Sequence, residues 1–596
     1  MAFLRIMVLL WADMLATYVM WIMQKYLTDV WKLGVTHAAG IMNVYTGLSK
    51  FLPLVFFIFV DAGLSNYRSL LLSSIAFSIG MGFLSMSTPP VLHKVTGTCK
   101  DYEPNCLGHT QKALFYTALA LIAAGLSGRV VSLVVFAENQ IEKNPDEPKE
   151  NEPNCKSSSM SLDRKGHDGK LINKPSLRLP SFKAKKPSLR LPSFMVKNPE
   201  REQQQQTEST KKAEVDLSQL QFQPLEAMLA LAQKDSGKLP GACCILLVPV
   251  VGLIALPYIK PWSIRFGIPA ICTLVATLAF VQGTRSCNKE ENRPAEGNTV
   301  TKKYRWSLCT RTEVEETKII IRMIPIWITF VICGVITSVG NTYFVEQASH
   351  MNYKIGKLKL PDSVILVFYG ISKLQIKSIY DAIGRYLKGA RKEKYAPSIG
   401  IALATIFSVL CCITAAGVET RRIHVIRSHG LLDKPDDKIP LSALVLLPQY
   451  FFLAGLDSFF ENSVTPFLTD QSPPSMKKHL VYLSPGLSGL GTVGSVLSVY
   501  VVGKISESRG KPNWFQYTLN QSRLDRYYWV LAVLSAANFL WFAFWAKLFP
   551  LREPDSNDKK ETGNDEEKAG NGELSESIVG FVTDGVMANF THSDKA

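Results

Sequence analysis

The chain has 596 residues, of which 47% are hydrophobic and 19% are charged, and 66 lysines and arginines outnumber 50 aspartates and glutamates. Soluble proteins carry more charge, at about 25% of residues. A basic excess is found in nucleic-acid-binding proteins and in proteins at anionic membranes. The apolar runs described next favour the membrane, so we expect no nucleic-acid partner. Met1 leads into an apolar run too long for a signal peptide, and we expect no separate leader.

A helix needs about 20 apolar residues to cross a bilayer. The sequence contains twelve runs of suitable length, in two groups of six. The first six are 3–26, 36–60, 68–87, 113–136, 241–259 and 264–284. The second six are 318–340, 362–383, 396–417, 441–464, 482–503 and 526–549. Two six-helix halves are typical of the major facilitator fold, so we expect an all-α membrane protein with two six-helix bundles.

These runs divide the chain into six parts. They are the first four spans (1–141), a basic loop (142–240), the fifth and sixth spans (241–284), a central linker (285–316), the last six spans (317–549) and a tail (550–596). The loop is rich in proline, serine, lysine and glutamine, and the tail is polar. Both compositions predict disorder.

The distribution of basic residues predicts the orientation in the membrane. Lysine and arginine are concentrated in segments 142–240 and 384–395, which the positive-inside rule assigns to the cytoplasm. Both termini then lie in the cytoplasm as well. Segment 421–438 is also basic but would face outward, and the rule does not explain this exception. The expected location is the plasma membrane or the vacuolar membrane, and no sorting signal distinguishes the two.

The loop 142–240 contains the sequence KPSLRLPSF twice, at 174–182 and 186–194. Each copy places an arginine three residues before a serine, Ser181 in the first and Ser193 in the second. One interpretation is a basic tether to anionic lipid whose charge a kinase reduces by phosphorylation. The other is a duplicated linker without a function of its own.

Two features fall in segments that are predicted to face outward. Cys99 and Cys106 lie between the third and fourth spans, and an oxidising location permits a disulfide between them. The sequence Asn520-Gln521-Ser522 is a glycosylation sequon in the loop before the last span.

Lys373 and Lys377 lie inside the apolar run 362–383. A charge near the bilayer centre costs roughly 2.5–3.5 kcal/mol on insertion scales, and residues four apart share one face of a helix. Two lysines on one face predict a polar cavity that could receive an anion. Lys377 is nearer the cytoplasmic end and could extend to the membrane surface.

Several collinear segments resemble a known family. They include WSLCTRTEVEETKIIIRMIPIW at 306–327, VETRRIHVIRSHGL at 418–431, LPQYFFLAGLDSFF at 447–460 and LDRYYWVLAVLSAANF at 524–539. These segments are similar to the plant nitrate/peptide transporter family, within the proton-dependent oligopeptide transporter group. The resemblance implies two bundles, alternating access around a central cavity, a small-molecule solute, and neither a cofactor nor an enzymatic activity.

The sequence departs from the family pattern at the residues that are linked to proton coupling. The first span of the family carries Glu-x-x-Glu-Arg, and the matching positions here are Leu10, Asp13 and Met14. The family lysine of the fourth span corresponds to Val130, with Arg129 beside it. One residue of shift turns a side chain by about 100° around a helix. Only Asp13 could titrate in the first span, so protons are an uncertain partner.

Other family positions are retained or changed conservatively. Asp457 replaces a glutamate of the tenth span that the family uses to bind a substrate amino group, and Glu461 follows on the same face. These acids either contact solute or pair with the two intramembrane lysines. Thr342 and Tyr343 match polar positions of the seventh span. Asp61 matches an aspartate in a loop that contributes to gating in the family. The basic residue that accompanies this aspartate in the family is missing here.

The sequence therefore predicts a secondary active or facilitative transporter of a small solute such as nitrate, a peptide or another organic anion or zwitterion. An alternative from another class is a transporter-derived receptor or scaffold that acts through the loop 142–240. An enzyme is disfavoured because the sequence contains no nucleophile elbow, metal-ligand cluster or phosphate-binding loop.

Overall fold

The computed structural model describes residues 2–61, 65–141, 252, 255–282, 311–355, 357–389, 393–435, 437–472 and 477–548. Apart from Ile141, they belong to one compact unit. The loop 142–240 with Ser181 and Ser193, most of the fifth predicted span and the tail lie outside these residues.

The first half of the chain is helical. Its elements are α1 (Ala2–Trp21), α2 (Met23–Asp29), α3 (Val35–Asp61), α4 (Asn66–Met86), α5 (Pro89–Thr96), η1 (Pro104–Cys106), α6 (His109–Ile141), η4 (Leu256–Tyr258) and α10 (Trp262–Gln282). The first predicted span is thus a pair of helices, α1 and α2. The remaining described spans of this half each coincide with one long helix.

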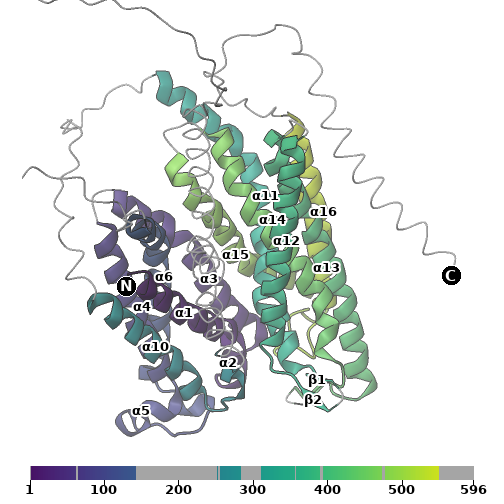
Figure 1. Cartoon of the computed structure of the whole chain (residues 1–596). Coiled ribbons are helices and arrows are strands. Elements are labelled where there is room, and N and C mark those ends of the chain that lie inside the picture. The colour runs from purple at the N-terminus through teal and green to yellow at the C-terminus, as the bar shows by residue number, and fades with distance from the viewer. Residues whose placement is uncertain are drawn as a thin grey trace, which may run out of the picture. The chain divides into compact units, whose positions relative to one another are not determined.

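The second half is also helical. Its helices are α11 (Arg311–His350), α12 (Val364–Gly389), η6 (Glu393–Tyr395), α13 (Ala396–Ser428), η7 (Ala443–Leu446), α14 (Leu447–Gln471), α15 (Lys477–Glu507), η9 (Ser508–Gly510) and α16 (Leu524–Leu548). A two-residue antiparallel ladder, β1 (Lys354–Ile355) with β2 (Leu358–Lys359), lies between α11 and α12. Figure 1 shows α12, α14, α13 and α16 side by side, and each packs against the next in that order.

The composition of these helices fits a membrane protein. Within the described residues, nine helices are long and apolar enough to cross a bilayer. The helix α12, which carries Lys373, Lys377 and Asp381, is not among them. The all-α membrane fold class is therefore confirmed. The number of spans stays a prediction, because the fifth lies largely outside the described residues.

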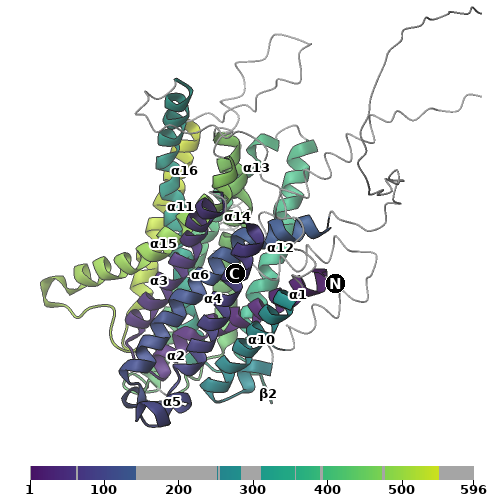
Figure 2. The same ribbon diagram turned by 90° about the vertical axis from the view of Figure 1, so that its left-hand side faces the viewer.

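The two halves meet along α3 and α15, which pack closely over much of their length (Figure 2). Glycine makes this approach possible. A Cβ on Gly489 would lie 2.7 Å from the carbonyl oxygen of Gly47 and 2.9 Å from the Cβ of Lys50. No side chain fits at such distances, so the backbones of α3 and α15 are in direct contact there.

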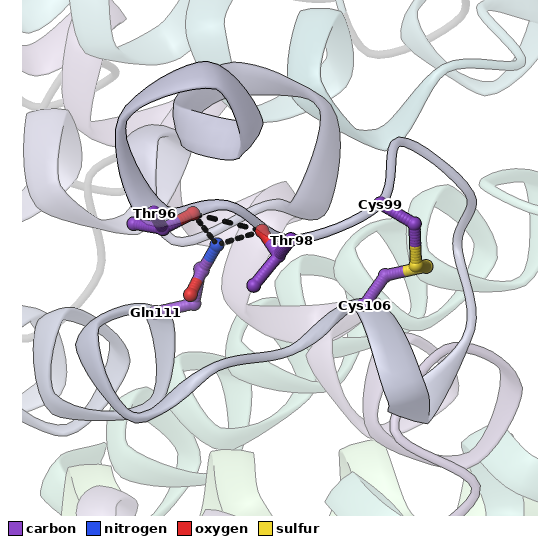
Figure 3. Close-up of a disulfide and its surroundings, with 5 residues drawn as sticks. All are labelled: Thr96, Thr98, Cys99, Cys106 and Gln111. Atoms are coloured by element: carbon purple, nitrogen blue, oxygen red, sulfur yellow. Dashed lines mark hydrogen bonds between the residues drawn. A yellow bond between two sulfur atoms is a disulfide. The ribbon is translucent and has the colours of Figure 1, made fainter.

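A disulfide joins Cys99 to Cys106, with 4.7 Å between their Cα atoms (Figure 3). Beside it, the Gln111 amide donates hydrogen bonds of 2.9 Å to the hydroxyls of Thr96 and Thr98. The loop therefore ties the end of α5 to the beginning of α6.

The basic segment 421–438 is largely explained by the length of α13, which continues to Ser428. Arg422 is completely buried and pairs with Glu419 one turn before it, at 2.7 Å from Nε to Oε2. Gln347 on α11 donates to the same carboxylate oxygen at 2.6 Å. Arg422 therefore belongs to a buried network and not to a free loop.

The same network argues against glycosylation of the sequon that begins at Asn520. Asn520 is only 3% exposed. Its Oδ1 accepts a hydrogen bond of 3.1 Å from Arg422, and its Nδ2 donates to the carbonyl of Leu431 at 3.1 Å. A glycan would replace one of the two Nδ2 hydrogens, and the buried position of Asn520 leaves no room for the sugar in the folded protein.

We predict that the purified, folded protein carries no glycan at Asn520, so endoglycosidase treatment leaves its electrophoretic mobility unchanged. The matched control is Lys94→Asn, which creates a sequon with Thr96 at an exposed position of α5. We expect this variant to be glycosylated and its mobility to shift on treatment. A shift in the unmodified chain would contradict the buried position of Asn520.

Candidate functional site

Besides the Glu419–Arg422 pair of α13, two groups of charged side chains within the described helices matter for a solute site. Asp13 on α1 and Arg129 on α6 form an ion pair within the first half. The second group, which we call the central cluster, consists of Lys50 on α3, Lys373 on α12, and Asp457 and Glu461 on α14. A charge inside a membrane protein needs a partner. The pairing within each group therefore determines which charged side chains are available to bind a solute.

Arg129 is enclosed by the first half. Its Nη1 binds the Asp13 carboxylate, its Nε donates to Ser74 Oγ at 3.2 Å, and its guanidinium lies 4.3 Å from the centre of the Phe77 ring. Only 2% of the residue is exposed. The neighbouring Val130 instead forms an apolar cluster with Tyr482 of α15. The one-residue shift therefore turns the cation into the bundle and leaves valine facing the other half.

Lys373 is held by Glu461. The Nζ of Lys373 lies 2.5 Å from Oε2 of Glu461, which links α12 to α14. The lysine is 1% exposed, whereas the Glu461 side chain is 41% exposed. Of the two α14 acids in the central cluster, Glu461 is thus the one that forms an ion pair with this lysine.

Asp457 is held by hydroxyl groups. Its Oδ1 accepts a hydrogen bond of 2.7 Å from Thr337 on α11, and its Oδ2 accepts one of 2.6 Å from Tyr369 on α12. The carboxylate is buried where three helices of the second half meet. Tyr369 lies four residues before Lys373, so the face argument used for the lysines could also have found it. No comparable signal marks Thr337.

The first half contributes Lys50 to the central cluster. Its Nζ donates to Ser488 Oγ on α15 at 3.4 Å, and it interacts electrostatically with Asp457, Glu461 and Lys373. Sequence reasoning missed this residue. The signal was a lysine inside the apolar run 36–60, the same signal that identified Lys373.

The chain is similar to several known transporters. The model of the POT family, PTR2, matches residues 290–515. The Arabidopsis thaliana protein NRT1/PTR FAMILY 5.5 is 29% identical and covers 89% of this chain and 94% of its own length. NRT1/PTR FAMILY 5.12 of the same plant is 24% identical over 89% of this chain and 88% of its own.

The solved structures show the same fold. The crystal structure of an auto-inhibited POT family peptide transporter has a TM-score of 0.57 and 12% identity, and covers 94% of this chain and 99% of that chain. A POT peptide transporter in complex with sulfate has a TM-score of 0.55 and the same identity. The chain resembles the NRT1/PTR family of POT transporters along most of its length. It is a multi-pass membrane protein that transports small solutes, not an enzyme.

Two residues chosen by resemblance to the NRT1/PTR family do not join the central cluster. Thr342 donates to the carbonyl of Ser338 in its own helix at 2.8 Å, and the Tyr343 ring packs edge-on against Tyr527 of α16 at 6.3 Å. At about 100° per residue, both are turned well away from Thr337, which faces Asp457. They stabilise the interior of the second half.

Two other residues that the sequence singled out, Lys377 and Asp61, are less informative. Lys377 is half-buried one turn beyond Lys373, and the side chain of Asp61 lies outside the described residues. In the described part of the chain, no three His, Cys, Asp or Glu side chains are grouped to hold a metal ion.

We predict that Arg129→Ala destabilises the fold by about 3–5 kcal/mol, because it leaves the Asp13 carboxylate buried without its cation. Thermal unfolding of the detergent-purified protein measures the loss. Arg421→Ala, which removes an exposed arginine of α13, is the matched control and should melt like the unmodified chain.

The double variant Asp13→Asn with Arg129→Gln should regain most of the stability, since no buried charge is left alone. Unchanged melting of Arg129→Ala would show that the pair is not structural.

Proposed function

We propose that this transporter carries a small zwitterion of the amino-acid or short-peptide type by alternating access, without obligatory proton coupling. The observation that carries the proposal is the placement of Lys50 and Asp457. They lie on opposite halves, interact electrostatically, and are each held by neutral hydroxyl groups. An ammonium group of a solute fits Asp457, and its carboxylate fits Lys50.

An inorganic anion fits the central cluster less well. Arg129 is neutralised by Asp13 and Lys373 by Glu461, so of the two lysines in the central cluster Lys50 is the one that is not paired with Glu461. An anion at Lys50 would also meet the Asp457 and Glu461 carboxylates. Repulsion between like charges in a poorly solvated site disfavours this arrangement.

The absence of proton coupling follows from the same pairs. Protonating Asp13 would leave Arg129 buried without a counter-charge, and protonating Glu461 would do the same to Lys373. Breaking a buried pair in this way costs several kcal/mol. The first-span carboxylate that the family uses for coupling is therefore unsuited to exchange a proton here.

The proposed orientation has both termini in the cytoplasm, in the plasma membrane or the vacuolar membrane. The loop 142–240 then faces the cytoplasm, where a kinase and anionic lipid could reach its repeats. Regulation through this loop, and the alternative of a receptor or scaffold, stay predictions because the loop lies outside the described residues.

We predict that Asp457→Asn lowers dialanine uptake by about ten-fold or more, since a charge-assisted hydrogen bond contributes roughly 1.5–3 kcal/mol. Uptake of labelled dialanine, alanine and nitrate by oocytes measures the effect. Asp470→Asn, an exposed position on the same helix, is the matched control. Nitrate uptake without uptake of either zwitterion would reject the proposed solute class.

We predict that zwitterion uptake changes by less than about two-fold between mildly acidic and neutral external pH, because protonating Asp13 or Glu461 would leave a buried cation without its partner. A zwitterion carried alone moves no net charge, so its uptake should evoke no current in voltage-clamped oocytes. A solute-evoked inward current that grows in acid would show that protons are co-transported.

A further inference from the structure

The loop between η9 and α16, residues 511–523, touches the first half of the chain through Tyr517. The carbonyl oxygen of Tyr517 accepts a hydrogen bond of 3.3 Å from the backbone N–H of Val35, and its hydroxyl donates to the carbonyl oxygen of Lys32. A Cβ on Gly34 would lie 3.4 Å from the Tyr517 ring. Tyr517 therefore holds the turn between α2 and α3 with its backbone, its hydroxyl and its ring.

The turn between α2 and α3 has a shape that the first half itself maintains. Lys32 has a φ of 49°, a left-handed conformation that few residues other than glycine adopt. The N–H of Leu33 donates to the carbonyl of Leu27 at 3.2 Å, and the Gln24 amide donates to the carbonyl of Val35 at 3.2 Å. The acceptor that Tyr517 uses is thus part of a fixed turn and moves with the first half.

The second half fixes the other side of the same loop. Arg422 donates to the carbonyl of Leu519 at 2.9 Å and to Oδ1 of Asn520 at 3.1 Å. Arg422 is held in turn by its buried ion pair with Glu419. Tyr517 lies two residues before these anchored positions, so it moves with the second half.

A second hydrogen bond joins the halves near the same turn. The hydroxyl of Thr28 on α2 donates to Oε2 of Glu346 on α11 at 3.3 Å, and the other oxygen of Glu346 lies 3.2 Å from His350 Nε2. Glu346 is 1% exposed, whereas Tyr517 is 62% exposed. The Thr28 contact is therefore inside the junction, and Tyr517 lies at its solvent-facing edge.

We propose that Tyr517 is a clasp that holds the two halves together at the end predicted to face outward, and that it sets how often the carrier opens there. Alternating access requires the halves to part at each end in turn. Opening at this end must release both hydrogen bonds of Tyr517, and water can replace them at a small net cost. Tyr517 is thus a positioning residue for the reorientation step, with the Glu419–Arg422 pair as its base. This inference does not depend on the class of solute.

Weakening the clasp should shift the carrier towards the form that is open at this end. We expect the ratio of open to closed carriers to rise about five-fold in Tyr517→Phe, which loses the hydrogen bond to Lys32. It should rise further in Tyr517→Ala, which also loses the contact of the ring with Gly34.

Distances between two spin labels measure this ratio without a solute. The labels are placed at Thr110 on α6 and at Lys434 after α13, which are both exposed, in a chain whose unpaired cysteines are replaced by serine. Opening in nanodiscs appears as a population with a longer distance between the labels. Tyr500→Ala, which removes a tyrosine of α15 that is 63% exposed, is the matched control and should leave the distances unchanged.

A crosslink tests whether the clasp must open during transport. A Cβ on Gly34 would lie 3.8 Å from the Cα of Tyr517, so cysteines at these two positions can form a disulfide. In Gly34→Cys with Tyr517→Cys, oxidation should abolish dialanine uptake into proteoliposomes and reduction should restore it. Each single cysteine variant, treated with the same oxidant, is the control for oxidation elsewhere in the chain.

Unchanged label distances in both Tyr517 variants would overturn the clasp, and so would undiminished uptake by the fully crosslinked chain. If the unmodified chain carries neither dialanine nor alanine, the proposed solute class is wrong. The label distances still decide the inference about Tyr517 in that case.

Discussion

A charge that lies inside a membrane helix needs a partner, and in this protein the choice of partners decides which charges remain for a solute. Arg129 could have been an anion site, but Asp13 neutralises it within the first half. Lys373 could have been another, but Glu461 neutralises it within the second. Within the central cluster, the pairing of Lys373 with Glu461 leaves Lys50 and Asp457. Both are held by hydroxyl groups, and they lie on opposite halves. The proposed preference for a zwitterion follows from this one cation and this one carboxylate.

The sequence predicts those features of the fold that depend on hydropathy alone. The apolar runs predict the long helices, because a helix that satisfies its own backbone is the favoured way for one segment to cross lipid. The prediction ended α13 at residue 417, eleven residues before the helix does. Hydropathy has no signal for the extension, since its polar side chains are stabilised by Glu419, Arg422 and Asn520 in a network that only the packed structure brings together.

The site was less predictable than the fold. Lys373 was identified from the cost of its charge, and the same rule applied to residues 36–60 would have found Lys50. The choice of Glu461 over Asp457 as the partner of Lys373 depends on how α12 and α14 are rotated against each other, which sequence spacing does not give. Thr342 and Tyr343 were taken from resemblance, and their orientation on α11 turns them towards the interior of the second half.

The pairing also bears on how the two halves can move. Asp13 with Arg129 and Lys373 with Glu461 each lie within one half, so rocking of the halves leaves both pairs intact. Hydrogen bonds that cross between the halves include those of Asn43 with Ser495 at 3.0 Å and of Lys50 with Ser488 at 3.4 Å. Such hydrogen bonds cost little to exchange for water. The two ion pairs therefore stabilise the separate bundles, and these hydrogen bonds lie at the junction that alternating access requires to open.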